Sequence, residues 1–141
     1  MLNENAKKWV AALRSGRFEQ GRWKLHFLGN GVAEPDSYCC LGVACVLAIE
    51  SGIQLDTVDA GGLRRYADPG GQGSINYLPE TVQAWLGLSN SQGLYKGENY
   101  KVQSLADDND KRKTFSEIAD IIESEPDGLF LKEGVDLGNK S

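Results

Sequence analysis

The chain has 141 residues, of which 40% are hydrophobic and 25% are charged. This size and composition are those of one globular domain and exclude a disordered or fibrous protein. The 15 Lys and Arg residues are outnumbered by 20 Asp and Glu residues, and the resulting net charge of -5 argues against a general binder of nucleic-acid phosphates.

The composition also bears on the compartment. The longest apolar stretch, residues 39–49, is shorter than the roughly twenty residues that a membrane-spanning helix needs. Residues 1–9 lack the basic-then-apolar order of a secretion signal. An odd, clustered set of three cysteines cannot form a disulfide framework around a fold. We therefore expect a cytoplasmic protein with reduced thiols and no membrane partner.

The first predicted element is an amphipathic helix over residues 5–15. Its apolar residues recur at the helical spacing i, i+3, i+4 and i+7, namely Ala6, Trp9, Val10 and Leu13. Gly16 is placed to end it, because glycine accepts the left-handed conformation that closes a helix. Residues 18–21 are interpreted as a connector.

The next predicted element is a strand over residues 23–28. Its alternating pattern would direct Trp23, Leu25 and Phe27 into the core and leave Lys24 and His26 in water. The turn residues at 29–31 and a short return through residues 32–33 would complete a hairpin.

A fully apolar helix is predicted over residues 38–51, capped by Asp36 or Ser37 and closed by Gly52. Apart from Gly42, every position from 39 to 49 is apolar or a thiol. A helix that is apolar all round must be surrounded by other elements. We therefore expect an α+β fold: a single domain over residues 1–133, in which this central helix is packed by other helices and a small antiparallel sheet, followed by a flexible tail at 134–141.

The second half of the chain alternates loops with short elements. Residues 53–77 are polar and glycine-rich and predict a long, partly mobile loop, with a brief strand at 75–78. A two-turn helix is predicted over 79–87, and a hairpin within 88–100. Thr114 and Glu117 form a capping box that begins a last helix, and residues 129–131 favour a final strand.

Several blocks of the sequence together resemble a known family. They are Trp9 with Ala12–Gly16, Phe18–Gly21, Tyr38–Val43, Leu78–Pro79, Trp85–Leu88, Asn109–Asp110, and Phe115 with Ile118–Ala119 and Ile122–Glu123. The chain resembles a family of small, largely uncharacterised proteins encoded mainly by bacteriophages and prophages, and the Tyr-Cys-Cys-Leu-Gly-Val block is the most specific part. The resemblance implies a phage-type origin, a host-cell cytosol and a shared fold, but no catalytic residues. His26 and residues 111–113 depart from the family pattern.

One interpretation of the cysteines is catalytic. Cys39 and Cys40 fall in the first turn of the central helix, where the helix dipole favours a thiolate, as in papain-like enzymes. His26, the only histidine, would be the base. Gln20 would stabilise an oxyanion, and Asn109 or Asp110 would orient the imidazole.

The other interpretation of the same thiols is structural, because a buried free cysteine behaves as a small apolar residue. It is favoured because the order of histidine before cysteine would require a permuted papain-like fold. Cys39, Cys40, Cys45 and His26 lack zinc-site spacing, and residues 107–110 lack the glycine and glutamate of a calcium loop and are interpreted as a solvated turn. No metal or cofactor is expected.

A ligand site is suggested by the glycine-rich segment. Arg64 and Arg65, with the backbone of Gly71 and Gly73, could contact a phosphate-bearing small molecule, although no phosphate-loop motif is present. The favoured function is therefore a small phage-type accessory protein that binds a host protein or such a metabolite without catalysis. The alternative is a cysteine-dependent hydrolase or transferase, and the sequence leaves self-association open.

Overall fold

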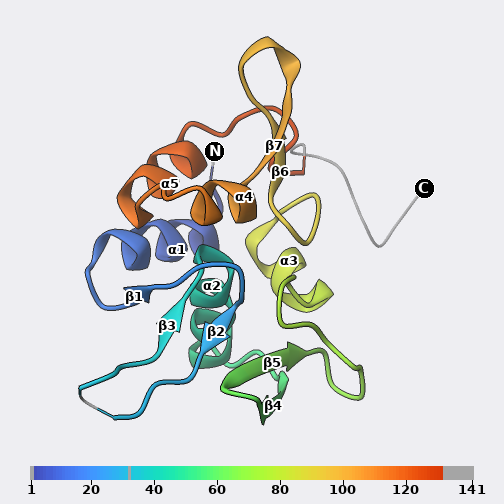
Figure 1. The fold of residues 1–141 in the computed structure, drawn as a ribbon. Coiled ribbons are helices and arrows are strands. Elements are labelled where there is room, and N and C mark those ends of the chain that lie inside the picture. Colours follow the sequence, from blue (N-terminus) through green and yellow to red (C-terminus); the bar gives the residue numbers. More distant parts are fainter. Residues whose placement is uncertain (1, 32, 132–141) are drawn as a thin grey trace.

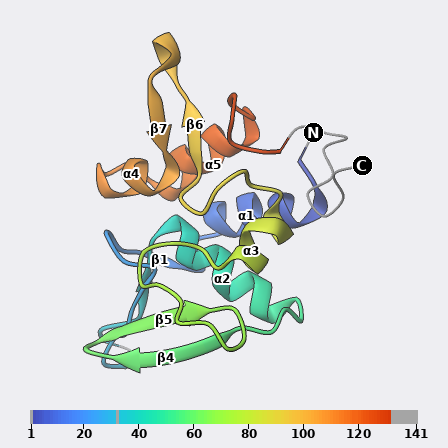
Figure 2. The same cartoon turned by 90° about the vertical axis from the view of Figure 1, so that its right-hand side faces the viewer.

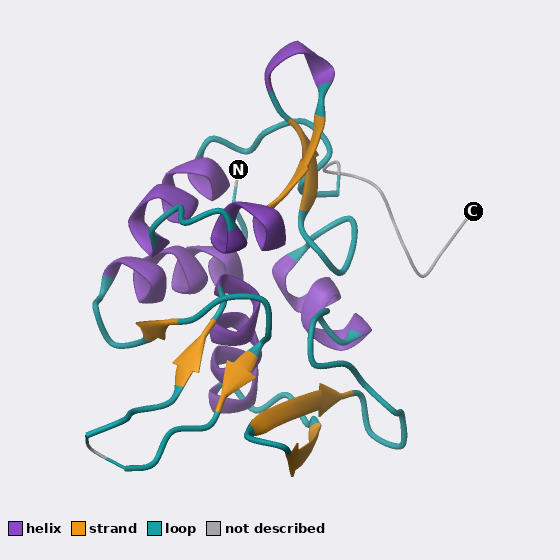
Figure 3. Ribbon diagram, in the orientation of Figure 1, coloured by secondary structure: helices purple, strands orange, loops and turns teal. Residues whose placement is uncertain are grey.

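The computed structural model describes residues 2–31 and 33–131, with most helices at one end and a small sheet at the other (Figures 1 and 3). The helices are α1 (Glu4–Arg14), α2 (Cys40–Glu50), α3 (Glu80–Leu86), α4 (Leu105–Asp110) and α5 (Phe115–Glu123), with a 3-10 turn η1 (Glu98–Tyr100). The strands are β1 (Glu19–Gln20), β2 (His26–Phe27), β3 (Ser37–Tyr38), β4 (Asp56–Ala60), β5 (Leu63–Ala67), β6 (Leu94–Lys96) and β7 (Val102–Ser104). This confirms the predicted α+β class. The predicted tail at 134–141 lies outside the described residues.

The apolar helix α2 occupies the centre, as its sequence predicts. Residues 40–45 are all buried, and α1, α3, α4 and β3 contact this helix (Figure 1). The indole of Trp9 on α1 is fully buried and donates a 2.9 Å hydrogen bond to the carbonyl oxygen of Cys40. Gly42 is required by the close approach of the β2 segment, because a Cβ atom there would lie 1.8 Å from the carbonyl oxygen of Leu25.

The start of α2 differs from the prediction. Neither Asp36 nor Ser37 caps it, because Ser37 and Tyr38 remain extended and pair with β1 and β2. Cys39 is the N-cap residue and provides no side-chain hydrogen bond. The helix end was predicted within a residue, since Ser51 is the C-cap and Gly52 follows with a φ of 101°.

The main sheet has the strand order β1-β3-β2-β5-β4, in which only β1 and β3 run parallel. The predicted connector at 18–21 therefore contains a strand. The predicted loop at 53–77 was also wrong over its first half, where β4 and β5 form a hairpin below α2 (Figure 2). Gly61 and Gly62, with φ of 62° and 77°, supply its two-residue turn. Because all of β4 is exposed, its residues lack the alternation that would have revealed a strand.

The predicted strand at 23–28 is confirmed only over residues 26–27, and two of its orientations were wrong. Trp23 is 65% exposed and has a φ of 72°, so the chain turns there before the strand begins. Leu25 is buried as predicted, but His26 is also buried, at 2% exposure. Polar neighbours satisfy its ring, which explains how a histidine occupies the interior. Of the hairpin's return segment, residue 32 lies outside the described ranges.

The predicted helices in the rest of the chain are confirmed. In α1, Asn3 caps the first turn, and in α5 the capping box of Thr114 and Glu117 is formed. The two helices pack together, and Arg14 joins them through Asp120 at 2.5 Å and Glu123 at 2.7 Å. α3 ends at Gly87 in the left-handed conformation. None of the helices in the described ranges is long and apolar enough to span a bilayer.

The remaining predictions for the second half of the chain had mixed outcomes. The hairpin predicted within 88–100 is found as β6 and β7, which project from the domain (Figure 2), but its second strand lies beyond the predicted range. The predicted turn at 107–110 is instead part of α4, capped by Ser104, and its Asp108 and Asn109 are buried. The predicted strand at 75–78 was wrong, because only Ser74, just before it, forms an isolated bridge, to Tyr66. The predicted strand at 129–131 reduces to an isolated bridge from Phe130 to Leu88.

Candidate functional site

The three thiols lie in the core. Cys39 is 5% exposed, and Cys40 and Cys45 are fully buried. Burial raises the pKa of the Cys39 thiol to about 11, which outweighs the opposite effect of the backbone N–H groups of Gly42 and Leu41. Burial also raises the pKa of Cys40 and Cys45 well above the ordinary value. The expected helix-dipole activation of these thiols is therefore overridden by desolvation.

The imidazole of His26 is occupied on both sides. Its Nδ1 lies 2.7 Å from the hydroxyl of Tyr66, and its Nε2 lies 2.6 Å from the carboxylate of Asp36. The ring of Tyr38 packs against it at a centroid distance of 4.2 Å. We call His26, Asp36 and Tyr66 the histidine cluster. With both ring nitrogens engaged, this imidazole has no free nitrogen for a thiol.

The histidine cluster reaches the surface through Asp36. The side chain of Asp36 is 37% exposed, and it lines a groove of about 320 Å³ together with Arg17 and Tyr38. The backbone N–H of Gly29, and then the imidazole of His26, lower the pKa of this carboxyl below its usual value.

Gln20 and Asn109 meet in a second polar group, at the start of α2. The side-chain oxygen of Asn109 accepts hydrogen bonds from the Cys40 backbone at 3.2 Å and from the Gln20 amide at 3.0 Å. Its amide nitrogen donates to the carbonyl oxygen of Gly21 at 2.7 Å. We call Gln20, Gly21, Cys40 and Asn109 the amide cluster.

Gln20 also ties this cluster to α5. Its side chain donates to the carbonyl oxygen of Lys113 at 2.7 Å and accepts from the Phe115 N–H at 3.2 Å. The side-chain amides of Gln20 and Asn109 therefore both have backbone partners. Asn109 binds β1 and α2 and does not orient the imidazole of His26, which pairs with Asp36 and Tyr66. Asp110 contacts neither thiol in these bonds; it accepts from the Trp23 N–H at 2.7 Å. The predicted catalytic residues thus fall into separate groups.

The acidic run forms no cation site. Within residues 2–31 and 33–131, no group of three or more His, Cys, Asp or Glu side chains is arranged to hold a metal ion. The hydroxyl of Tyr95 donates to the carboxylate of Asp108, and burial raises the pKa of that carboxyl.

Two of the four predicted ligand residues come together. Arg65 and Gly71 line a groove of about 380 Å³ on the outer face of the β4–β5 hairpin. The other lining residues are Val58, Ala60, Leu63, Gln72 and Ile75, so the groove is apolar around one guanidinium. We call it the Arg65 groove.

The other two predicted ligand residues have structural roles. Arg64 forms a two-point ion pair with Asp59, at 2.7 and 2.9 Å, on the opposite face of the hairpin. Gly73 has a φ of 70°, and a Cβ atom there would lie 2.3 Å from the carbonyl oxygen of Tyr66. Gly73 therefore permits the close packing of its loop against β5.

A larger groove was not predicted from the sequence. It measures about 630 Å³ and lies between the β6–β7 hairpin and the end of α5, with Lys101 and Lys113 in its lining. The basic run Lys111–Lys113 was the available signal, but residues 111–113 stood out only as a departure from the resembled family.

Comparison with known proteins gave one match. The family model described as "Domain of unknown function (DUF8296)" matches residues 1–126, which include the central helix, both polar clusters and the Arg65 groove. No curated protein and no solved structure matches the chain.

Proposed function

This chain belongs to the DUF8296 domain family, and we propose that it acts by binding a small organic anion in the Arg65 groove, as an accessory protein of phage type. The proposal rests on one observation: a guanidinium lies in a groove whose neighbours are mostly apolar. Such a combination of one charged group and apolar walls is typical of small-molecule sites.

The charge of Arg65 is available to a ligand. Among the described residues, Arg65 forms no ion pair, whereas its neighbour Arg64 is held by Asp59. An arginine offers two parallel N–H donors that match the oxygens of a carboxylate or phosphate. In a chain of net charge -5, a cation without an ion-pair partner is free to anchor an external anion.

The walls of the groove define the rest of the ligand. Val58, Ala60, Leu63 and Ile75 line the groove together with Arg65 and would contact an apolar body. The loop amides do not form a phosphate cradle, because the N–H of Gly70 donates to Asp56 and that of Gly71 to Asp68. The groove therefore fits a monophosphate or carboxylate with an aromatic or aliphatic body better than a polyphosphate.

Binding is favoured over cysteine catalysis by the contacts of the thiols and the imidazole. The thiols are buried with raised pKa values, and both nitrogens of His26 are engaged by Asp36 and Tyr66. A cysteine hydrolase needs the opposite arrangement, with an exposed thiolate beside a free base. The resemblance to small phage proteins without known catalytic residues supports the same choice.

Titration with phenyl phosphate, followed by NMR of the backbone amides and the arginine Nε–H groups, tests this proposal. Binding should shift the signals of Arg65, Gly71 and Gln72, and inorganic phosphate, which lacks the apolar body, should bind more weakly. Arg65→Gln should weaken phenyl phosphate binding by about tenfold or more, since it removes a charged hydrogen-bond pair. Arg112→Gln removes the same group from another surface and should leave binding unchanged. Shifts confined to other regions, or equal affinity in Arg65→Gln, would contradict the proposal.

A further inference from the structure

We propose that the groove between the β6–β7 hairpin and α5 binds an acidic segment of a partner protein. This site is separate from the Arg65 groove, because the two hairpins lie at opposite ends of the domain (Figure 2). Its volume of about 630 Å³ can hold several side chains of a bound peptide. We call it the hairpin groove, and its lining residues are Tyr95, Gly97, Glu98, Asn99, Lys101, Gln103, Lys113, Ile121, Ser124 and Pro126.

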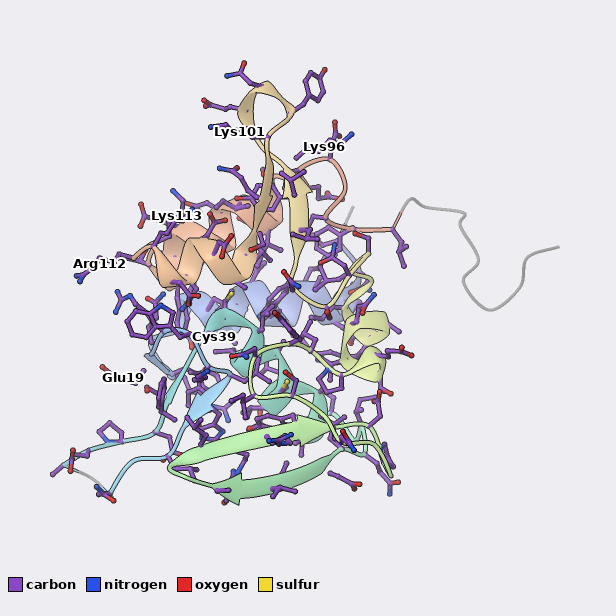
Figure 4. The ribbon with its side chains drawn as sticks, turned by 45° about the vertical axis from the view of Figure 1, so that its right-hand side comes forward. Glu19, Cys39, Lys96, Lys101, Arg112 and Lys113 are labelled. Carbon is purple, nitrogen blue, oxygen red and sulfur yellow. The ribbon has the colours of Figure 1, made fainter. Side chains whose placement is uncertain are left out.

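The first observation is a group of cations that form no direct ion pair within residues 2–31 and 33–131, although Lys111 and Lys113 lie close enough to Asp108 to act on its charge. Five cations gather on β6, on the loop after η1 and on the turn between α4 and α5, namely Lys96, Lys101, Lys111, Arg112 and Lys113. Figure 4 shows the four that it labels at the hairpin and at the α4–α5 turn. In the described part of the chain no carboxylate forms an ion pair with any of them, whereas Lys7, Arg14, Arg17 and Arg64 all have acidic partners.

This contrast is informative because the protein is acidic. Carboxylates outnumber cations over the chain as a whole, so cations without acidic partners are not explained by a shortage of acids. Lys101 and Lys113 approach the groove from two different elements, and a single carboxylate of the groove, Glu98, accompanies them. An acidic segment placed between the two lysines would pair with both.

The second observation is the exposed apolar surface of the hairpin. Tyr100 is 78% exposed and Val102 is 69% exposed. Asn99 and Tyr100 adopt positive φ values of 58° and 59°, a conformation that costs energy in residues other than glycine. The hydrogen bond from the N–H of Gly97 to the carbonyl oxygen of Lys101, at 2.8 Å, closes this loop. An exposed tyrosine next to cations is a common anchor in protein interfaces.

The charge pattern favours an acidic peptide over a nucleic acid. Nucleic acids carry closely spaced phosphates along their whole length, and the net charge of -5 would repel such a chain beyond the groove. A peptide can place a few carboxylates at the lysines and apolar side chains against Ile121 and Pro126 in the groove, with the exposed Tyr100 beside it on the hairpin. The partner segment is therefore expected to combine Asp or Glu with apolar residues.

Fluorescence anisotropy with a short labelled peptide that alternates Glu with Leu and Phe tests the inference. The acidic peptide should bind more tightly than a matched peptide with Lys in place of Glu, and more tightly than a labelled oligothymidylate. Lys101→Glu and Lys113→Glu should each weaken binding by about fivefold, with the weakening reduced at high salt. Tyr100→Ala should also weaken it without changing the charge.

Lys8→Glu is the matched control, because it makes the same charge change on α1, away from the groove. If Lys8→Glu weakens the acidic peptide as much as Lys101→Glu does, net charge explains the binding and the groove is not the site. Tighter binding of the oligothymidylate or of the basic peptide would also overturn the inference. Circular dichroism of each variant shows whether the fold is retained, and NMR shifts at Gln103 and Ile121 of the unmodified protein locate the peptide independently of any substitution.

Discussion

The two polar clusters both join segments that are distant in the sequence, but with different chemistry, and the amide cluster does so at the start of α2. The amide cluster consists of neutral groups, and Asn109 is fully buried with its oxygen and nitrogen both bonded. The histidine cluster contains two ionisable side chains besides Tyr66, and it reaches solvent through Asp36. One cluster therefore joins α2, β1 and α4 at any pH, while the other joins β2, β5 and the loop before β3 in a way that depends on charge.

The reactivity of the three thiols tests whether the core around α2 is closed to reagents in solution. Iodoacetamide should label none of the three cysteines at neutral pH unless the protein opens, because the thiols are buried and the pKa of Cys39 is raised to about 11. With opening free energies of about 5 kcal/mol, labelling should be on the order of a thousandfold slower than in urea. Mass spectrometry of the labelled protein measures the rate. Fast labelling of Cys39 in the folded protein would revive the cysteine-enzyme alternative.

Asn109→Ala should produce the next largest effect. It leaves the N–H of Cys40 and the carbonyl oxygen of Gly21 without their partner in a buried site, and we expect the free energy of unfolding to fall by about 3 kcal/mol. Urea unfolding monitored by tryptophan fluorescence measures the change. The same substitution at the exposed Asn30 is the control and should cost far less. Equal losses at both positions would show that the amide cluster does not hold the fold.

Asp36→Asn should have the smallest effect and the only one that depends on pH. The pKa of Asp36 is lower in the folded protein than in the unfolded chain, so its stabilisation is fully present above about pH 4 and is lost as pH falls through the folded pKa. Because the side chain is 37% exposed, we expect less than about 1 kcal/mol near neutral pH. Urea unfolding from pH 2 to 7 should show a shallower acid loss for Asp36→Asn than for the unmodified protein. A parallel curve, or an equal flattening in the exposed control Asp127→Asn, would contradict this role.

The helices could be predicted because each carries its own signal. α1 and α5 have apolar residues at helical spacing and side-chain caps, and α2 has an unbroken apolar run that only a core can hold. Gly16, Gly52 and Gly87 mark the ends of three helices, through backbone conformations that glycine adopts easily. These signals are local, so they survive without knowledge of the rest of the fold.

The sheet and both polar clusters depend on partners distant in the sequence. β1, β2 and β3 have two residues each, too few to show alternation, and β1 pairs with β3 across 18 positions. His26 was predicted in water because its partners, Asp36 and Tyr66, are remote, and their contact could not be read from spacing. The predicted catalytic residues fall into separate groups, because the partners of His26, Gln20 and Asn109 are set by tertiary contacts that the sequence does not display.

The packing of α1 against α5 has a consequence for the synthesis of the chain. Arg14 binds Asp120 and Glu123, more than a hundred positions later, and α1 lies between α5 and α2, in contact with both (Figure 1). A ribosome releases the first helix long before the last one, so the apolar face of α1 has no permanent neighbour on that side until translation is almost complete. In the nascent chain, Trp9 and the apolar surface of α2 are therefore exposed to aggregation. The finished protein should also fold more slowly than its helix content suggests, because contacts between segments that are remote in the sequence form last.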